Sequence, residues 1–166
     1  MKTATVFGSL SSNADQNFDS ALNLLKQKNI KKIFIGGYYG QIKNFADKCQ
    51  EHDIEAILII TQKGKDLGYG SNEKIKEVAV EKYFDKKSFL LSSSDLFFFL
   101  PTQKIGLGLF SEIVDLLEYS VVYCNLVKKE PPCIIFMGQI YKNIVNEILT
   151  RFQTINTLAC NVDYVN

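Results

Sequence analysis

The chain has 166 residues, of which 46% are hydrophobic and 22% charged, and its formal net charge is +1. This composition is typical of a globular protein, and the length suits a single domain over residues 1–166 whose core needs no disulfide or metal support. The near-neutral charge, with a single arginine among 19 basic residues, excludes binding of nucleic acid or of an acidic membrane through bulk charge.

The cysteines and the histidine of the chain are too scattered for a metal site. They are Cys49, His52, Cys124, Cys133 and Cys160. Neither the Cys-x-x-Cys spacing nor the cysteine–histidine pairing of a zinc site is present, so we expect no metal, four buried reduced thiols and a surface position for the histidine. The N-terminal apolar run is too short for a signal peptide, and no window approaches the roughly 20 apolar residues of a membrane span. We therefore expect a cytoplasmic protein without membrane contact.

The first part of the chain alternates short apolar runs with amphipathic stretches. Residues 3–7 predict a strand, and apolar residues at helical spacing predict a helix over 13–28. A strand at 32–35, a helix at 40–52 and a strand at 55–60 follow. Unbroken apolar runs separated by helices are typical of a parallel sheet that is covered on both faces.

The second part continues this alternation after a polar interruption. Residues 62–74 contain three glycines and several charges, so we expect a surface loop there. The remaining elements are predicted as an edge strand at 77–81, a helix at 83–91, a central strand at 96–100, a helix at 107–126, a strand at 133–137, a helix at 141–152 and a strand near 158–162. The whole pattern predicts a Rossmann-like, doubly wound α/β fold with a mainly parallel sheet and helices on both faces.

The loop after the first strand is a candidate ligand site, because ligands of such sheets bind beyond the carboxyl ends of the strands. It begins with Gly8 and Ser9 and places a glycine and three hydroxyl groups before a helix. Free backbone amides and the helix dipole favour an anion at such a place. The alternative is a plain turn in which a polar side chain caps the helix.

The loop after the second strand is rich in glycine. Gly36, Gly37 and Gly40 allow a ligand to approach the backbone without a Cβ atom in the way. Their spacing matches neither the Walker loop nor the dinucleotide fingerprint, which argues against nucleoside triphosphate hydrolysis and nicotinamide binding. Tyr38 and Tyr39 lie between these glycines, where aromatic rings could stack on a base or fill the space.

A third glycine-containing loop follows the most apolar strand. Gly106 and Gly108 lie near the start of a predicted helix, and Glu112 is expected in its first turn. A carboxylate there interacts favourably with the helix dipole on a solvated face. The functional alternative is a carboxylate that points into a pocket, where it holds a sugar or helps a proton to move.

These loops occur in the same order as in the Rossmann-like family that includes the Lonely Guy phosphoribohydrolases, long misannotated as lysine decarboxylases, and most of the chain resembles that family. The segments that carry the resemblance are Val6–Ser9, Ile35–Gly40 and Ser94–Pro101, the last being similar to the strand before the family's PGGxGTxxE motif. The resemblance implies a homodimeric enzyme that hydrolyses the N-glycosidic bond of a nucleoside 5′-monophosphate. It implies release of the base and ribose 5-phosphate without a metal or a redox cofactor.

The resemblance also implies roles for single residues. Glu112 takes the position of the motif's glutamate, which would bind the ribose hydroxyls and stabilise an oxocarbenium-like transition state, and Lys86 takes the position of a catalytic arginine. The residues matched to phosphate and ribose binding are Gly8, Ser9, Gly36, Gly37, Gly40, Gly106 and Gly108.

The chain departs from the family's motif in the third loop. Leu109 replaces a threonine that serves the phosphate, Ile105 replaces the first glycine, and residues 102–104 are extra. Lys104 could supply a cation to a phosphate or could simply be solvated. Lysine at position 86 keeps the charge of the arginine but loses its planar fork.

Three functions therefore remain open at the level of the sequence. The first is a nucleoside 5′-monophosphate phosphoribohydrolase with altered or weak activity, and the second is a catalytically degenerate nucleotide-binding or scaffold protein. A flavodoxin-like or response-regulator-like signalling domain is disfavoured because no acidic pair follows the first strand. The helix at 107–126 is apolar over more than one face, which indicates either a subunit interface or a helix buried within the monomer.

Overall fold

The computed structural model describes residues 2–9, 18–71, 73–94, 96–120, 124–128, 130–151 and 161–165. Within these ranges, strands and helices follow one another in the order β1 (Lys2–Phe7), α1 (Asp19–Gln27), β2 (Ile30–Ile35), α2 (Gly40–Gln50), β3 (Glu55–Thr61), α3 (Gln62–Asp66), β4 (Lys76–Val80), α4 (Tyr83–Ser92), β5 (Leu96–Phe99), α5 (Leu107–Glu118), α6 (Cys124–Leu126), β6 (Cys133–Met137), α7 (Gln139–Arg151) and β7 (Asn161–Val165).

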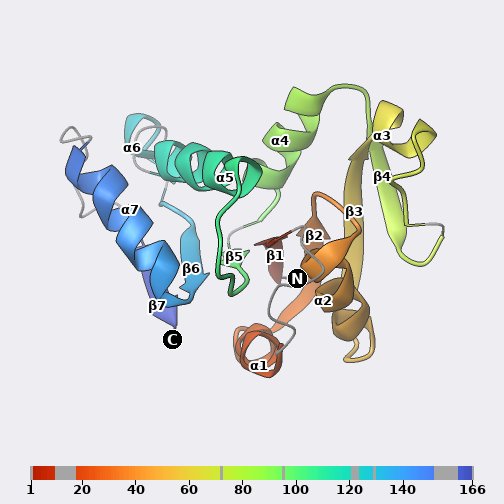
Figure 1. Ribbon diagram of the computed structural model, residues 1–166, viewed down its shortest axis with the longest axis horizontal. Helices are drawn as coiled ribbons and strands as arrows, with labels where there is room; N and C mark the ends of the chain where they lie inside the picture. The colour runs from red at the N-terminus through yellow and green to blue at the C-terminus, as the bar shows by residue number, and fades with distance from the viewer. Residues whose placement is uncertain are drawn as a thin grey trace.

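The described strands form one seven-stranded sheet in the order β4-β3-β2-β1-β5-β6-β7 (Figure 1). Every pair of neighbouring strands is parallel. The chain runs outward from β1 to β4, returns to place β5 on the other side of β1, and then runs outward again to β7. The predicted doubly wound α/β fold is confirmed, and its topological switch point lies between β1 and β5.

Alternate residues of the strands face two separate helix layers. Val6 belongs to the core that β1, β2 and β3 share with α1 and α2, whereas its neighbour Phe7 belongs to the core under α5 and α7. A third cluster, which includes Phe34 and Leu90, packs α4 against β2 and β3. In Figure 1, α1 and α2 lie on one side of the sheet and α4 and α5 on the other. Burial on both faces explains why β5, Leu-Phe-Phe-Phe, contains no polar residue.

Aromatic stacking fills the core under α5 and α7. The rings of Phe7, Phe99 and Phe136 stack in sequence, with centroid separations of 4.8 Å and 4.6 Å. Tyr141 of α7 is fully buried beside them, and its hydroxyl donates a hydrogen bond to the carbonyl oxygen of Leu100 at 2.7 Å. This bond satisfies the buried phenol and ties α7 to the chain that leaves β5.

Several predicted boundaries need correction. The segment expected to be loop over 62–74 begins with the short helix α3, which Thr61 caps because its Oγ1 accepts a hydrogen bond from the Gly64 amide at 3.0 Å. Of the helix expected over 107–126, α5 is described at Leu107–Glu118 and α6 at Cys124–Leu126, and residues 121–123 between them lie outside the described part of the chain. The last strand is described at Asn161–Val165, in the register that pairs Val165 with Met137, so it continues past the predicted end at 162, and residues 158–160 of the prediction lie outside the described residues.

Parts of other predicted elements fall outside the described residues. The helix expected from residue 13 is described from Asp19 on, and the one expected to reach residue 152 is described to Arg151. Loop residues 10–13, which follow Ser9, are also outside the described part of the chain, as is Cys160.

The described cysteines are free thiols, and their environments differ. Cys49 and Cys124 are buried as predicted, but Cys133 is only half-buried because it begins β6 near the edge of the core. His52 is exposed in the turn after α2, as expected. In the part of the chain that the structure describes, no helix has both the length and the apolar character needed to cross a membrane.

Candidate functional site

A cavity of about 330 Å³ lies at the carboxyl ends of β1, β2 and β3, beside the switch point of the sheet. Its volume is at the lower end of the range of roughly 300–1,000 Å³ that is typical of small-molecule sites. The residues that line it are Val6, Phe7, Gly8, Gly36, Gly37, Tyr39, Ile42, Ile60, Thr61, Gly64, Tyr69, Tyr83, Lys86, Gly108, Leu109 and Glu112. The fold therefore brings together all three loops that the sequence singled out.

Gly8 and Gly36, in the first two loops, are closely packed. A Cβ atom on Gly8 would lie 3.0 Å from Gln41 Oε1 and 3.1 Å from Leu100 Cδ1. A Cβ atom on Gly36 would lie 3.0 Å from Leu90 Cδ1 and 3.3 Å from Lys86 Cε. Side chains at these positions would fill the narrow space where β1 and β2 end, so glycine keeps the backbone of both loops accessible to the cavity.

Glu112 and Lys86 meet at the cavity wall from two different helices. Glu112 lies on α5, after its first turn and not within it as predicted, and Lys86 lies on α4. The Lys86 ammonium group donates a hydrogen bond to the carbonyl oxygen of Gly36, which holds it over the end of β2. It is near enough to Glu112 for the two charges to interact. The predicted pair of acid and cation is thus assembled around one loop.

Burial changes the ionisation of both groups. It raises the pKa of Glu112 to about 7, although the charges of Lys86 and Lys87 act in the opposite direction. Burial also lowers the pKa of Lys86, and the charge of Glu112 counteracts this change. For both groups the cost of desolvation exceeds the gain from the opposite charge. A carboxyl that titrates near pH 7 inside a cavity is suited to proton transfer and is a marker of functional sites.

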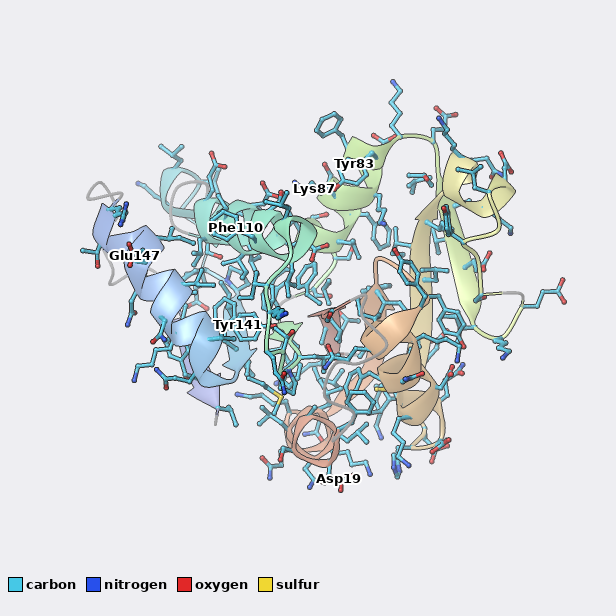
Figure 2. All side chains as sticks on the ribbon, viewed as in Figure 1. Asp19, Tyr83, Lys87, Phe110, Tyr141 and Glu147 are labelled. Atoms are coloured by element: carbon cyan, nitrogen blue, oxygen red, sulfur yellow. The ribbon has the colours of Figure 1, made fainter. Side chains whose placement is uncertain are left out.

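Lys87, which follows Lys86 in α4, contacts α5 and does not line the cavity. Lys87 forms an ion pair with Asp115 and donates a hydrogen bond to Ser111 Oγ at 3.0 Å, so it fastens α4 to α5. Figure 2 shows Lys87 where these two helices approach each other. Of the lysine pair that the resemblance singles out, only Lys86 lines the cavity.

Some described residues that the sequence singled out lie outside the cavity lining, namely Ser9, Gly40, Lys104 and Gly106. The Ser9 amide donates to Gln41 Oε1 at 3.0 Å. Gly40 begins α2 with φ of +59°, a left-handed conformation that glycine adopts without strain. Gly106 is the exposed residue before α5, and Lys104 is exposed in the loop that precedes it. These residues shape or flank the loops, whereas their neighbours face the cavity.

The two tyrosines of the second loop are separated by the structure. Tyr38 is 7% exposed, and its hydroxyl donates to Asp47 in α2, so it belongs to the core and neither stacks on a ligand nor fills the cavity. Burial and the nearby Asp47 raise its pKa. Tyr39 points the other way and lines the cavity. Leu109 also lies within the lining, where it presents an apolar side chain.

Sequence reasoning missed Gln41. This side chain is fully buried, accepts the hydrogen bond from the Ser9 amide and donates from Nε2 to the carbonyl oxygen of Pro101 at 2.7 Å. It therefore joins the loops after β1 and β5 across the switch point. A single glutamine in the first turn of an amphipathic helix carries no signal of this role in the sequence.

Comparison of the chain with protein-family models gives no match, and comparison with curated proteins gives no match either. Functional interpretation therefore rests on the geometry of the cavity. Among the described residues, no group of three or more histidine, cysteine, aspartate or glutamate side chains is placed to hold a metal ion. The described groups suited to chemistry at this wall of the cavity are a carboxyl that titrates near neutrality, a lysine and the backbone of three glycine-containing loops.

Proposed function

We propose that the protein is an N-glycosidase of the phosphoribohydrolase kind, which hydrolyses a nucleoside 5′-monophosphate to its base and ribose 5-phosphate. The observation that carries the proposal is the placement of Glu112 beside Lys86 in a cavity at the switch point of a parallel sheet. The resemblance of the chain to the Lonely Guy family supports the same reaction, because those positions match the family's glutamate and arginine.

The proposed chemistry uses Glu112 as a carboxylate. The carboxylate binds the ribose hydroxyls, stabilises positive charge that develops at the anomeric carbon, and accepts a proton from the attacking water. The bond between the anomeric carbon and the base nitrogen breaks, and its electron pair stays on the nitrogen, which takes up a proton. One water is consumed for each base and ribose 5-phosphate formed. Backbone amides around Gly8, Gly36 and Gly108 hold the phosphorylated sugar.

A second candidate is a nucleotide-binding protein without hydrolytic activity. Leu109 favours it, because this residue brings an apolar side chain to the wall where the resemblance implies a phosphate-binding hydroxyl. Loss of one preorganised donor typically costs about 10²–10³ in rate. Saturable stabilisation by nucleotides against thermal unfolding, without release of base, would decide for this candidate.

The deciding experiment measures base release by chromatography from a panel of nucleoside 5′-monophosphates. We expect release by the wild type and a loss of at least about 100-fold in Glu112→Gln, because the amide cannot accept the proton. Glu118→Gln is the matched control, since Glu118 is an exposed glutamate on the same helix and does not line the cavity. Equal rates for wild type and Glu112→Gln would contradict the proposal, as would the absence of release from every substrate.

A further inference from the structure

The mouth of the cavity carries three tyrosines from three separate elements. Tyr39 precedes α2, Tyr69 follows α3, and Tyr83 begins α4, and all three line the cavity. Their exposed fractions are 44%, 58% and 58%, and in the described part of the chain they are the tyrosines that are largely exposed. Figure 2 shows Tyr83 at the outer end of α4. Exposed tyrosines are thus concentrated at one cavity, although the sequence separates them widely.

The tyrosines contribute little to the core. The ring of Tyr83 meets that of Phe84 edge-on, with 6.0 Å between the ring centroids, and Phe84 is itself 75% exposed. Large aromatic surfaces left in water lose the hydrophobic stabilisation that burial would supply. Tyrosine rings can recover it by covering a flat ligand while their hydroxyl groups remain hydrated, which is why they are enriched at binding surfaces.

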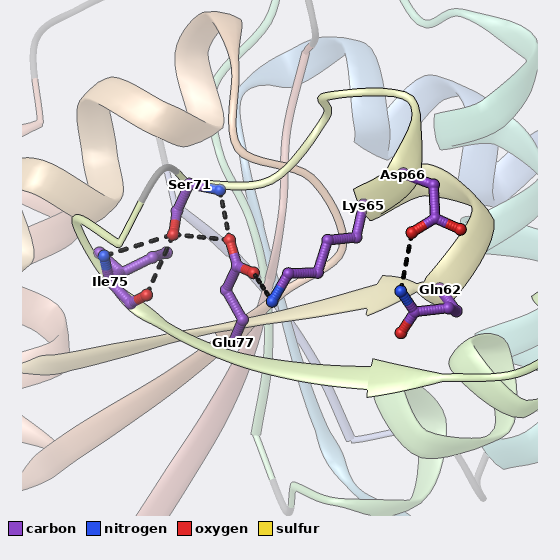
Figure 3. Close-up of polar contacts among 6 residues, drawn as sticks. All are labelled: Gln62, Lys65, Asp66, Ser71, Ile75 and Glu77. Atoms are coloured by element: carbon purple, nitrogen blue, oxygen red, sulfur yellow. Dashed lines mark hydrogen bonds and ion pairs between the residues drawn. The ribbon is translucent and has the colours of Figure 1, made fainter.

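The segment that carries Tyr69 is ordered by a polar network (Figure 3). Glu77 of β4 accepts hydrogen bonds from the Ser71 amide and from Ser71 Oγ, the latter at 2.7 Å, and pairs with Lys65 of α3 at 3.1 Å. The hydrogen bonds from Ser71 and the charge of Lys65 lower the pKa of Glu77, so this carboxylate remains ionised near neutral pH. The Tyr69 amide donates to the Gly64 carbonyl oxygen at 3.0 Å. The Tyr69 backbone is therefore held from both sides.

The inner part of the cavity differs from its mouth. Glu112 and Lys86 lie on one wall, and the glycine-containing loops lie at the ends of β1 and β2. A ligand whose polar part reaches these groups would leave its remaining part among the tyrosines. We propose that Tyr39, Tyr69 and Tyr83 form an aromatic clamp that binds the planar base of the ligand, and that Glu77 is a positioning residue for Tyr69. This inference rests on the proposed function for the identity of the ligand and deepens it by placing the base.

The test is a binding titration by calorimetry with adenosine 5′-monophosphate, adenine and ribose 5-phosphate as probes. Alanine at position 39, 69 or 83 is expected to weaken binding of adenosine 5′-monophosphate and of adenine at least about 5-fold per residue, because stacking on a base is lost. The affinity for ribose 5-phosphate is expected to stay within about 2-fold of the wild-type value, which is the variation expected for neutral surface substitutions. Phenylalanine at the same positions keeps the ring and should keep the affinity.

Leu67→Ala serves as a matched control, since this side chain is an exposed neighbour of Tyr69 in the chain and does not line the cavity. Glu77→Ala should weaken adenine binding and speed amide hydrogen exchange over residues 67–71. Asp66→Ala, which removes only the exposed contact with Gln62 at 2.8 Å, should do neither. Undiminished adenine binding by all three alanine variants, or equal losses in the controls, would overturn the clamp. So would a wild type that binds no adenine.

The outcomes separate this inference from the proposed reaction. Adenine binding that depends on the tyrosines, without base release from any nucleotide, would refute the hydrolase and support the clamp. Base release with normal adenine affinity in the alanine variants would refute the clamp and support the hydrolase.

Discussion

At Glu112, burial and two lysines act in opposite directions on one carboxyl group. Burial raises its pKa to about 7, and Lys86 opposes this more strongly than Lys87 does. Lys86→Met should therefore raise the pKa of Glu112 further, and Lys87→Met should raise it by less. Titration of the glutamate side-chain carbons by NMR measures both shifts without relying on activity. A larger shift in Lys87→Met than in Lys86→Met would contradict this placement of the two lysines.

The same carboxyl makes stability depend on pH. The folded protein holds the Glu112 proton up to about pH 7, whereas an unfolded chain releases it at about pH 4.3, so the buried carboxyl lowers stability progressively as the pH rises from about 4.3 to about 7, and the loss is complete above about pH 7. Glu112→Gln removes this effect. At pH 8 we expect the variant to have a higher melting temperature than the wild type, because its free energy of unfolding is higher by roughly 1–3 kcal/mol. At pH 4 the two proteins should unfold at similar temperatures. Equal melting temperatures at pH 8 would contradict the burial of this charge.

Substitution by alanine should change the free energy of unfolding in opposite directions at two glycines of the site. Gly8→Ala places a methyl group 3.0–3.2 Å from three side-chain atoms, and overpacking of this kind costs roughly 1–3 kcal/mol. Gly108→Ala meets nothing within 4 Å and lies in the first turn of α5, where alanine is favoured over glycine by about 0.5–1 kcal/mol. Urea unfolding measures both. A stable Gly8→Ala variant would show that the loop after β1 has more room than the structure indicates.

At the scale of elements, Gln41 links α2 to the loops after β1 and β5. Gln41→Leu keeps the volume but removes the acceptor of the Ser9 amide and the donor to the Pro101 carbonyl oxygen. Loss of buried hydrogen-bond partners should lower the free energy of unfolding by about 2 kcal/mol or more. Gln62→Leu, at an exposed position of α3, is the matched control and should change stability little. Similar urea midpoints for the two variants would argue against a link across the switch point.

The boundaries of some elements can be predicted from the local pattern of apolar residues alone. The strands at Lys2–Phe7 and Cys133–Met137 lie within a residue of their predicted positions, because an unbroken apolar run is itself the signal of a buried strand. The short helix α3 was missed because its cap is formed by Thr61, the last residue of β3.

At the scale of the whole molecule, the homodimer implied by the resemblance stays a prediction. Several large apolar side chains of α4, α5 and α6 are exposed, and they support it: Phe84, Leu107, Phe110 and Leu126. Light scattering coupled to gel filtration should give about twice the chain mass of 18.8 kDa for the wild type. Phe110→Glu should shift the mass toward that of one chain, because a charge is costly in an apolar interface. A wild type with the mass of one chain at micromolar concentration would exclude the dimer.

The class of the fold and the candidate ligand-binding loops follow from the amino-acid sequence alone. Apolar runs without alternation require a sheet covered on both faces, and the ligand-binding edge of such a sheet follows from the direction of its strands. The sequence also singled out Glu112 and glycines of these loops by residue type and position, whereas Lys86 was singled out only by the resemblance to the Lonely Guy family.

Which of these residues lie close together depends on the three-dimensional fold. The return of the chain from β4 to β5 places α4 and α5 over one cavity, which brings Lys86 to Glu112 and leaves Lys87 to bind Asp115. The fold also buries Tyr38 in the core, whereas Tyr39 lines the cavity together with Tyr69 and Tyr83. The raised pKa of Glu112 also belongs to this level, since burial by distant segments is its main cause. Contacts between segments far apart in the chain leave no local pattern, so no reading of spacing could supply them.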